Sequence, residues 1–234
     1  MSTDAARSGQ RVVVVTGATG ATGRATCDAL VRRGERVVAV GRDAESLTTL
    51  RVSDLLETRV CDLLDGTAVS SLAADLVAAH GGVDGLFHLV GGWRGGDSFT
   101  ASTDDDWQWL SGNLVDTLRH TSLVLHDTLL ASRRGRVAIV SAAAAGAPTA
   151  GNAAYAAAKA AAETWLLALA DSFATAAGTP GSAATIGVVR WIGQGRTATS
   201  PEQVADWLVG LLDADPAEVN GARHDLTARP LQDR

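Results

Sequence analysis

One tyrosine and one lysine lie four residues apart in the stretch NAAYAAAKAAAE at residues 152–163, and the chain holds no other residue of either type. Lys159 is the single lysine among twenty basic residues, so composition disfavours lysine everywhere else. On a helix, Tyr155 and Lys159 would share one face, one turn apart. A phenol with a pKa of about 10 is a weak acid, and a nearby ammonium lowers that pKa. The pair therefore predicts a tuned proton donor.

A glycine-rich turn supplies a second candidate for chemistry. The apolar segment 11–16 runs into TGATGATGR at residues 16–24, and a helical pattern follows. Glycine lets the main chain approach a diphosphate closely, and the helix N-terminus offers free N–H groups to the anion. Its place between the first strand and the first helix predicts a dinucleotide site. The candidate cofactor-binding residues of this turn are Gly17, Thr19, Gly20, Ala21, Thr22 and Gly23.

The ends of the next two strands bear on the choice of cofactor. Arg42 follows the second strand, where an arginine pairs with the 2′-phosphate of NADP and an acid would accept from the ribose hydroxyls of NAD. We expect NADPH, with NADH as the alternative, because Asp43 is better placed to cap the next helix. Asp62 and Leu63 follow the third strand and are candidates for adenine contact. A helix-entry role for Asp62 is an equal alternative.

These residues need a scaffold, and strand and helix patterns alternate along the chain. Near-continuous apolar strands are typical of a parallel sheet covered on both faces. The expected fold is α/β, a doubly wound Rossmann-type sheet in one domain over residues 11–234, after a disordered lead at 1–10. The strand candidates are 11–16, 36–41, 57–61, 83–90, 135–141, 183–190 and about 219–226. The helix candidates are 21–33, 43–50, 66–80, 103–131, 149–177 and 201–213.

Together, the tyrosine–lysine pair and the glycine-rich turn resemble the short-chain dehydrogenase/reductase family over about residues 11–228. The resemblance implies strand order 3-2-1-4-5-6-7 and hydride transfer between a nicotinamide and a substrate carbon. It implies that Tyr155 donates the proton and that Lys159 holds the nicotinamide ribose. Asn113 matches the asparagine that helps to hold a proton-relay water. By their places after the fourth and sixth strands, the resemblance adds three cofactor-binding candidates: Val90, Gly91 and Ile192.

The sequence also departs from the family pattern. The catalytic serine usually lies thirteen residues before the tyrosine, and Ala142 occupies that position. Ser141 lies one residue too early, so strand alternation would turn its side chain to the other face unless the loop shifts. Losing one donor of this kind costs about 2–4 kcal/mol in oxyanion-type sites. Ala142, the stretch 90–96 and the segment 178–184 are similar to the dihydropteridine reductase branch, which also lacks the serine and reduces a flat quinonoid heterocycle.

Two tryptophans lie where ligands bind in open α/β sheets, after the carboxyl ends of strands. Trp93 and Trp191 are therefore candidate walls of a substrate site beside Ala142, and packing over the glycine-rich loops is an equal alternative. His88 is expected to be a satisfied core histidine. The leading hypothesis is an NADPH-dependent reductase acting on a conjugated C=O or C=N of a small flat molecule. The alternatives are a conventional ketone or alcohol oxidoreductase that uses Ser141, and a non-catalytic dinucleotide-binding sensor or structural partner.

Composition narrows the remaining classes. With 46% hydrophobic residues and a net charge of −6, the chain resembles an ordinary globular protein and is unsuited to nucleic acid or an anionic membrane. Two cysteines give neither a disulfide framework nor a metal spacing, which favours a cytoplasmic protein without a metal. The alanine-rich stretch 153–162 and the long helix expected at 103–131 predict a homodimer or homotetramer.

Overall fold

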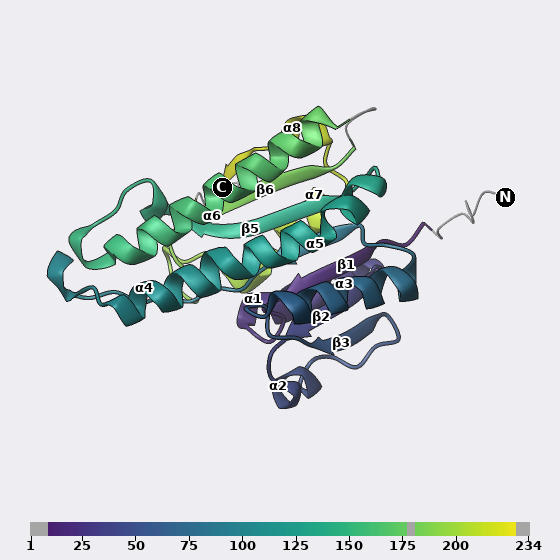
Figure 1. The fold of residues 1–234 in the computed structure, drawn as a ribbon, viewed down its shortest axis with the longest axis horizontal. Coiled ribbons are helices and arrows are strands. Elements are labelled where there is room, and N and C mark those ends of the chain that lie inside the picture. The colour runs from purple at the N-terminus through teal and green to yellow at the C-terminus, as the bar shows by residue number, and fades with distance from the viewer. Residues whose placement is uncertain (1–8, 177–180, 228–234) are drawn as a thin grey trace, which may run out of the picture.

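The computed structural model describes residues 9–176 and 181–227, so the lead at 1–8 and part of the segment 178–184 lie outside the described residues. Its centre is a parallel sheet of seven strands in the order β3-β2-β1-β4-β5-β6-β7, as expected (Figure 1). The strands are β1 (Val12–Thr16), β2 (Arg36–Gly41), β3 (Leu56–Val60), β4 (Gly85–His88), β5 (Arg136–Ala142), β6 (Ala183–Val189) and β7 (Arg223–Asp225).

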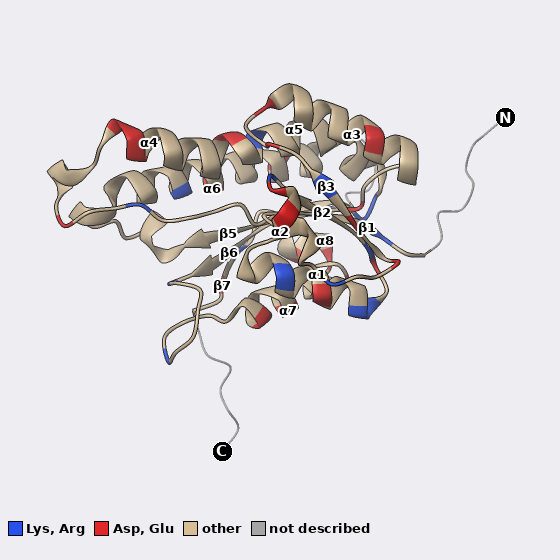
Figure 2. Cartoon of the chain, turned by 90° about the horizontal axis from the view of Figure 1, so that it is seen from below, with Lys and Arg blue, Asp and Glu red and all other residues tan. Residues whose placement is uncertain are grey.

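Helices cover both faces of this sheet, as an edge-on view shows (Figure 2). Helices α3, α5 and α6 bury their apolar sides on one face, and α1 and α7 bury theirs on the other. No described helix is long and apolar enough to cross a bilayer. The α-helices are α1 (Ala21–Arg33), α2 (Ala44–Thr48), α3 (Gly66–His80), α4 (Asp104–Ser111), α5 (Thr117–Ala131), α6 (Ala153–Thr175), α7 (Pro201–Leu211) and α8 (Pro216–Val219).

Several helix ends follow from side-chain capping. Asp43 accepts hydrogen bonds from the amides of Glu45 and Ser46, and Asp65 caps α3 in the same way. Gly34 ends α1 with φ of 87°, a left-handed conformation that glycine adopts without strain. The structure confirms the predicted boundaries of α1, β2 and α3. These boundaries could be predicted because residues that begin or end a helix lie beside them in the sequence.

The long helix predicted at 103–131 is confirmed in its extent, since helical structure runs from Asp104 to Ala131. It is not regular throughout: a π-helical turn η2 (Gly112–Asp116) lies between α4 and α5. Within η2 the amide of Thr117 reaches back five residues to the carbonyl of Gly112, and the side-chain Nδ2 of Asn113 donates to the carbonyl of Trp109 at 2.8 Å. The side-chain amide of Asn113 thus bonds to a carbonyl that accepts from a main-chain amide in a regular α-helix, and the turn that follows is wider.

Three other features differ from the prediction. β4 ends at His88 and not at residue 90, so the glycine-rich stretch that follows is loop. The helix expected from residue 149 begins at Ala153, after a short 3₁₀ turn η4 (Ala150–Asn152). A short helix α8 lies between the helix predicted at 201–213 and the strand predicted at about 219–226, where no element was expected, because Asp215 and Pro216 form a helix start.

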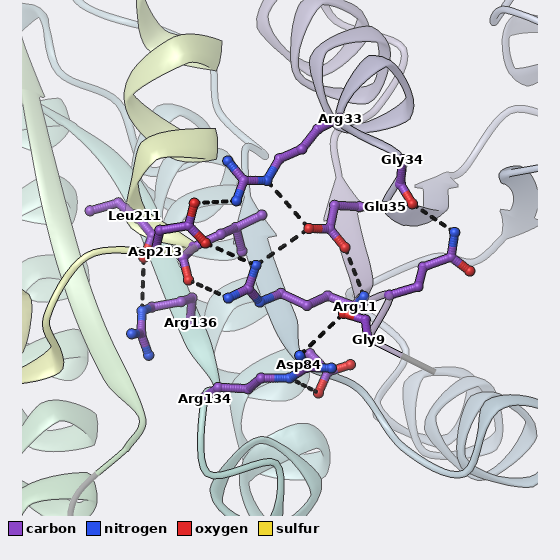
Figure 3. Close-up of polar contacts among 12 residues, drawn as sticks. Gly9, Arg11, Arg33, Gly34, Glu35, Asp84, Arg134, Arg136, Leu211 and Asp213 are labelled. Carbon is purple, nitrogen blue, oxygen red and sulfur yellow. Dashed lines mark hydrogen bonds and ion pairs between the residues drawn. The ribbon is translucent and has the colours of Figure 1, made fainter. Parts of the chain in front are cut away.

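A network of charged residues joins the amino ends of the strands (Figure 3). The Arg11 guanidinium lies between Glu35, 3.3 Å away, and Asp213, 3.2 Å away. Arg33 pairs with the same two carboxylates. Arg136 is buried, and it donates to the main-chain carbonyls of Leu211, Gly135, Gly181 and Ala214. These contacts hold the C-terminal end of α7 against the amino edge of the sheet.

Candidate active site

Helix α6 presents Tyr155 and Lys159 to one cavity. Lys159 is buried, its Nζ donates to the main-chain carbonyl of Val140 on β5 at 2.8 Å, and it lies 5.9 Å from the centre of the Tyr155 ring. The side chains share a helix face, as the spacing predicts. The hydrogen bond to β5 fixes where the ammonium lies relative to the end of the strand.

The electrostatics of this pair differ from the prediction. Burial lowers the pKa of Lys159 to about 8, and the carboxylate of Glu163 acts in the opposite direction. Burial raises the pKa of Tyr155, and the charge of Lys159 is not among the causes of that shift. The predicted lowering of the Tyr155 pKa by Lys159 therefore does not appear in this structure, where burial accounts for the shift and the shift is upward.

The cavity holding this pair has a volume of about 510 Å³ and lies at the carboxyl ends of β4, β5 and β6. The loops after those strands and the start of α6 form its walls. The sequence-predicted residues that line it are Thr22, Val90, Gly91, Trp93, Ser141, Ala142, Tyr155, Lys159, Trp191 and Ile192. The structure thus brings most of the predicted catalytic and substrate-binding residues together.

Ser141 reaches this cavity from inside a regular strand. β5 continues through Ala142 without a shift, and both residues line the same cavity. Ser141 is 1% exposed, and its Oγ has no hydrogen-bond partner among the described residues. A buried hydroxyl without a partner costs stability, so it is a group that a ligand could satisfy.

A second cavity of about 270 Å³ lies beside the first. Leu89, Val90 and Gly91 line both, so the two cavities meet at the loop after β4. The sequence-predicted residues in the second cavity are Gly17, Thr19, Gly20, Arg42, Asp62, Leu63, Val90, Gly91 and Asn113. Most of the predicted dinucleotide residues therefore line two adjoining cavities between the end of β2 and Tyr155.

Two members of the glycine-rich turn line neither cavity. Ala21 begins α1, and a Cβ at Gly23 would lie 2.3 Å from the carbonyl oxygen of Gly17. Gly23 therefore lets the first turn of α1 approach the loop closely, which is a packing role. Gly17 has φ of 67°, so it also needs glycine for its backbone conformation.

The acidic residues near the second cavity have local partners. The bonds from Ser46 and Glu45 lower the pKa of the Asp43 carboxyl, as its capping role predicts. Asp62 accepts from the amide of Leu64 at 3.0 Å, and Asp65, not Asp62, caps α3. Arg42 is exposed and makes no hydrogen bond or ion pair with the described residues. The guanidinium of Arg42 is thus available to an anion.

Asn113 does not share a cavity with Tyr155. Its side chain is held by Trp109, and its main-chain carbonyl accepts from the hydroxyl of Thr117 at 2.6 Å. It lines the smaller cavity only. The relay position implied by the family resemblance therefore stays a prediction.

His88 is a core histidine with satisfied nitrogens, as predicted. It is 3% exposed; its Nδ1 lies 2.9 Å from the hydroxyl of Thr16 and its Nε2 lies 3.1 Å from that of Thr117. Burial and then the charge of Lys159 lower its pKa to about 3, so the ring is neutral. It also lines the larger cavity, as an uncharged part of the wall.

The loops that carry the tryptophans are held by close main-chain contacts. The amide of Gly96 donates to the carbonyl of Gly151 at 2.9 Å, and a Cβ at Gly151 would lie 2.1 Å from the Gly96 oxygen. The Trp93 ring packs over Gly95 and the Trp191 ring over Gly193. Both indoles nevertheless stay exposed, Trp93 at 63% and Trp191 at 44%, so packing and cavity lining occur together.

Several lining residues were missed by sequence reasoning. Thr117 and Trp109 come from the interrupted helix, which the helical pattern does not reveal. Asn152 and Ala144 belong to the loop between β5 and α6. Arg190 could have been found, because it follows a strand at its carboxyl end, where ligands bind in such sheets. The described residues hold no group of three His, Cys, Asp or Glu side chains placed to bind a metal.

Comparison with known proteins defines the class. A family model described as short chain dehydrogenase matches residues 11–181, and the chain belongs to this family of oxidoreductases. It is 31% identical over 151 residues to the short-chain dehydrogenase/reductase olcF of Penicillium canescens, covering 64% of this chain and 58% of that one. The chain thus matches little more than half the length of that relative.

Two further similarities extend over more of the chain. An uncharacterized oxidoreductase of Staphylococcus haemolyticus is 27% identical over 230 residues, which cover 94% of this chain and 97% of that one. An NADPH-bound short chain oxidoreductase of Pseudomonas aeruginosa PAO1, described as containing an atypical catalytic center, superposes with a TM-score of 0.81 at 21% identity. That superposition covers 92% of this chain and 94% of the other, and it shows the shared fold. The local resemblance to the dihydropteridine reductase branch stays a prediction.

Proposed function

We propose that the protein is an NADPH-dependent reductase that delivers hydride to a conjugated C=O or C=N of a small flat substrate. The observation that carries the proposal is the convergence of Tyr155 and Lys159 on a 510 Å³ cavity that meets the glycine-lined cavity at Val90 and Gly91. A single ligand with a phosphate end and a reactive ring could extend through both. The NADPH-bound relative from Pseudomonas aeruginosa supports this assignment.

The residues present fit such a cofactor. Gly91 has open space beside its Cα, and Gly20 approaches only the carbonyl of Gly17, so the backbone there is accessible to a diphosphate. Arg42 would pair with the 2′-phosphate, and Asp62 would accept from the adenine amino group. Lys159 would hold the ribose hydroxyls. When bound, NADPH supplies the hydride.

The remaining steps belong to the chain itself. Burial raises the pKa of Tyr155, so its phenol stays protonated at neutral pH and can donate that proton to the substrate oxygen or nitrogen. The half-buried cavity wall excludes part of the water, and Trp93 and Trp191 would hold a planar substrate by ring contact. Ala142 adds no hydrogen-bond donor, which suits an electron-poor conjugated substrate.

Replacing Tyr155 by phenylalanine tests the proposal. We expect NADPH oxidation, followed by absorbance across a panel of conjugated carbonyls, imines and quinonoid compounds, to fall by about 10²–10⁴-fold. Cofactor affinity measured by calorimetry should stay unchanged. A variant that retains most of its turnover would remove Tyr155 from the mechanism. Binding of NADPH without turnover of any compound by the wild type would instead favour a dinucleotide-binding sensor.

One observation favours a second function. Ser141 lines the same cavity as Tyr155 and its buried Oγ has no partner among the described residues, so a loop shift that exposes this hydroxyl would let it bind the oxygen of an isolated ketone. The protein would then be a conventional ketone or alcohol oxidoreductase.

We also propose a homo-oligomer formed through α4, α5 and α6. Their outer faces expose Trp107, Leu123 and Leu167, at 45%, 56% and 45%. Light scattering measures the mass directly, and a monomer at micromolar concentration would contradict this assembly. The single domain over residues 11–234 and the cytoplasmic location also stay predictions.

A further inference from the structure

The larger cavity has an uneven charge. Its lining includes two cationic side chains, Lys159 and Arg190, and no aspartate or glutamate. The chain as a whole carries a net charge of −6, so the positive charge of the cavity lining is opposite in sign to the net charge of the protein. A concave, partly apolar surface with one sign of charge attracts the opposite sign.

Of these two cations, only Arg190 is exposed. The Lys159 ammonium donates to the carbonyl of Val140. Arg190 is exposed, follows β6 directly and makes no hydrogen bond or ion pair with the described residues. The charge of Arg190 acts on the carboxylate of Asp225. The pKa of Asp225 is lowered mainly by hydrogen bonds from Thr227, and Arg190 makes the smallest contribution. The guanidinium is therefore free for a ligand.

The neighbours of Arg190 restrict the shape of that ligand. Trp191 follows it in the chain, Trp93 lines the same cavity from the loop after β4, and both indoles are largely exposed. Exposed indoles gain most from covering a flat apolar surface. Arginine binds carboxylate through two parallel hydrogen bonds.

We propose that Arg190 recognises a carboxylate on a flat, conjugated substrate whose rings contact Trp93 and Trp191. This assignment names the substrate class of the reductase site and rests on the proposed function. The carboxylate would lie at the cavity rim, and the reducible bond would lie toward Tyr155. The specificity residue is Arg190, because the other described cation of this cavity, Lys159, is buried, donates to the Val140 carbonyl and is assigned to the cofactor ribose.

An anion at Arg190 could also come from the cofactor, since phosphate and carboxylate are recognised by the same fork. The position favours the substrate. Arg190 lines the tyrosine cavity and is absent from the lining of the smaller cavity, where Arg42 and the glycine-rich turn lie. The two sources predict different effects of an Arg190 variant on cofactor affinity.

The test uses a matched pair of flat probes, 2-naphthoate and its neutral isostere 2-naphthamide, titrated calorimetrically into the full chain with and without saturating NADP⁺. We expect wild type to prefer naphthoate, and Arg190→Ala to lose that preference by about tenfold or more. Arg190→Lys should keep part of it. Arg51→Ala is the matched control, because Arg51 is exposed in the loop before β3 and lines neither cavity.

Three results would overturn the inference. The first is equal binding of the two probes by wild type. The second is an unchanged naphthoate preference in Arg190→Ala with an unaltered melting temperature, and the third is an Arg190→Ala variant that loses NADP⁺ affinity but keeps the naphthoate preference. The outcome is separable from the reductase proposal. If wild type turns over neutral quinonoid compounds but shows no naphthoate preference, only the inference about Arg190 is contradicted. If wild type prefers naphthoate but turns over no compound, only the reductase function is contradicted.

Discussion

The ammonium of Lys159 donates to the main-chain carbonyl of Val140 at 2.8 Å, so the only lysine of the chain joins α6 to β5 at the wall of the larger cavity. The bond holds the ammonium in a buried place, and this burial lowers the pKa of Lys159.

Stability should therefore change with pH through Lys159. Its pKa is about 8 in the folded protein and 10.5 without burial, so between those values the unfolded chain binds more protons. The free energy of unfolding contributed by this group should rise as pH increases across that window, because folding no longer buries a charge. Urea denaturation at a series of pH values measures it. Lys159→Met should flatten the rise, and a variant with the wild-type slope would contradict the assignment.

Ser141→Ala separates the two enzymatic proposals. If the substrate is conjugated, kcat/KM should change little, and the melting temperature should stay equal or increase because an unpaired buried hydroxyl is removed. Steady-state kinetics and thermal melts measure both. A loss of about 10²–10³ in kcat would show that the hydroxyl stabilises the reacting oxygen and would favour the ketone oxidoreductase.

His88 should make the fold sensitive to acid. Its pKa is about 3 when folded, against 6.5 for the free side chain, so between these values the unfolded chain binds the extra proton. The free energy of unfolding should therefore fall as pH decreases from about 6.5 toward about 3. His88→Asn should be less stable at neutral pH, because one amide cannot bridge Thr16 and Thr117, yet it should lose less stability on acidification. Equal acid slopes would show that other groups cause the loss.

Gly151→Ala should separate the loop that carries Gly96 from the turn η4 that precedes α6. The added Cβ would lie 2.1 Å from the carbonyl oxygen of Gly96, so the loops must separate at a cost of about 1–3 kcal/mol. Chemical denaturation measures that cost, and KM for the substrate should increase. Gly146→Ala is the matched control, because its nearest neighbour would be 3.9 Å away. Equal stability of the two variants would contradict the close contact.

Arg136→Met should destabilise the fold without altering the site. The change removes the donors to the buried carbonyl of Leu211 and to the half-buried carbonyls of Gly181 and Ala214, at a cost of about 3 kcal/mol or more. At a temperature where the variant is folded, kcat should equal that of wild type. Arg32→Met, an exposed change on α1, should be neutral. A lowered kcat in folded Arg136→Met would mean that the two edges of the sheet are coupled.

The sequence predicts the elements that are fixed by local chemistry. The β-branched runs define β1 and β2, and the glycine at residue 34 ends α1, because these signals act over a few residues. The interruption at Asn113 has no such signal: a helical periodicity is the same whether an amide bonds four or five residues back. The sequence therefore predicts the extent of this helix and not the π-turn inside it.

The site was predictable in its members and not in its electrostatics. The spacing of Tyr155 and Lys159 places both on one helix face, which the structure confirms. Their pKa values are shifted by burial, which is a tertiary feature. The free charge of Arg190 is likewise visible only once its surroundings are known. Sequence reasoning therefore finds the reacting groups before it finds what tunes them.

The ion network around Arg11, Glu35 and Asp213 lies at the amino edge of the sheet, and the cavities lie at the carboxyl edge (Figure 3). Mechanical cohesion and substrate choice are thus assigned to opposite rims. Substitutions at the exposed positions of the tryptophan-bearing loops would leave the ion network intact, because that network lies at the opposite edge of the sheet.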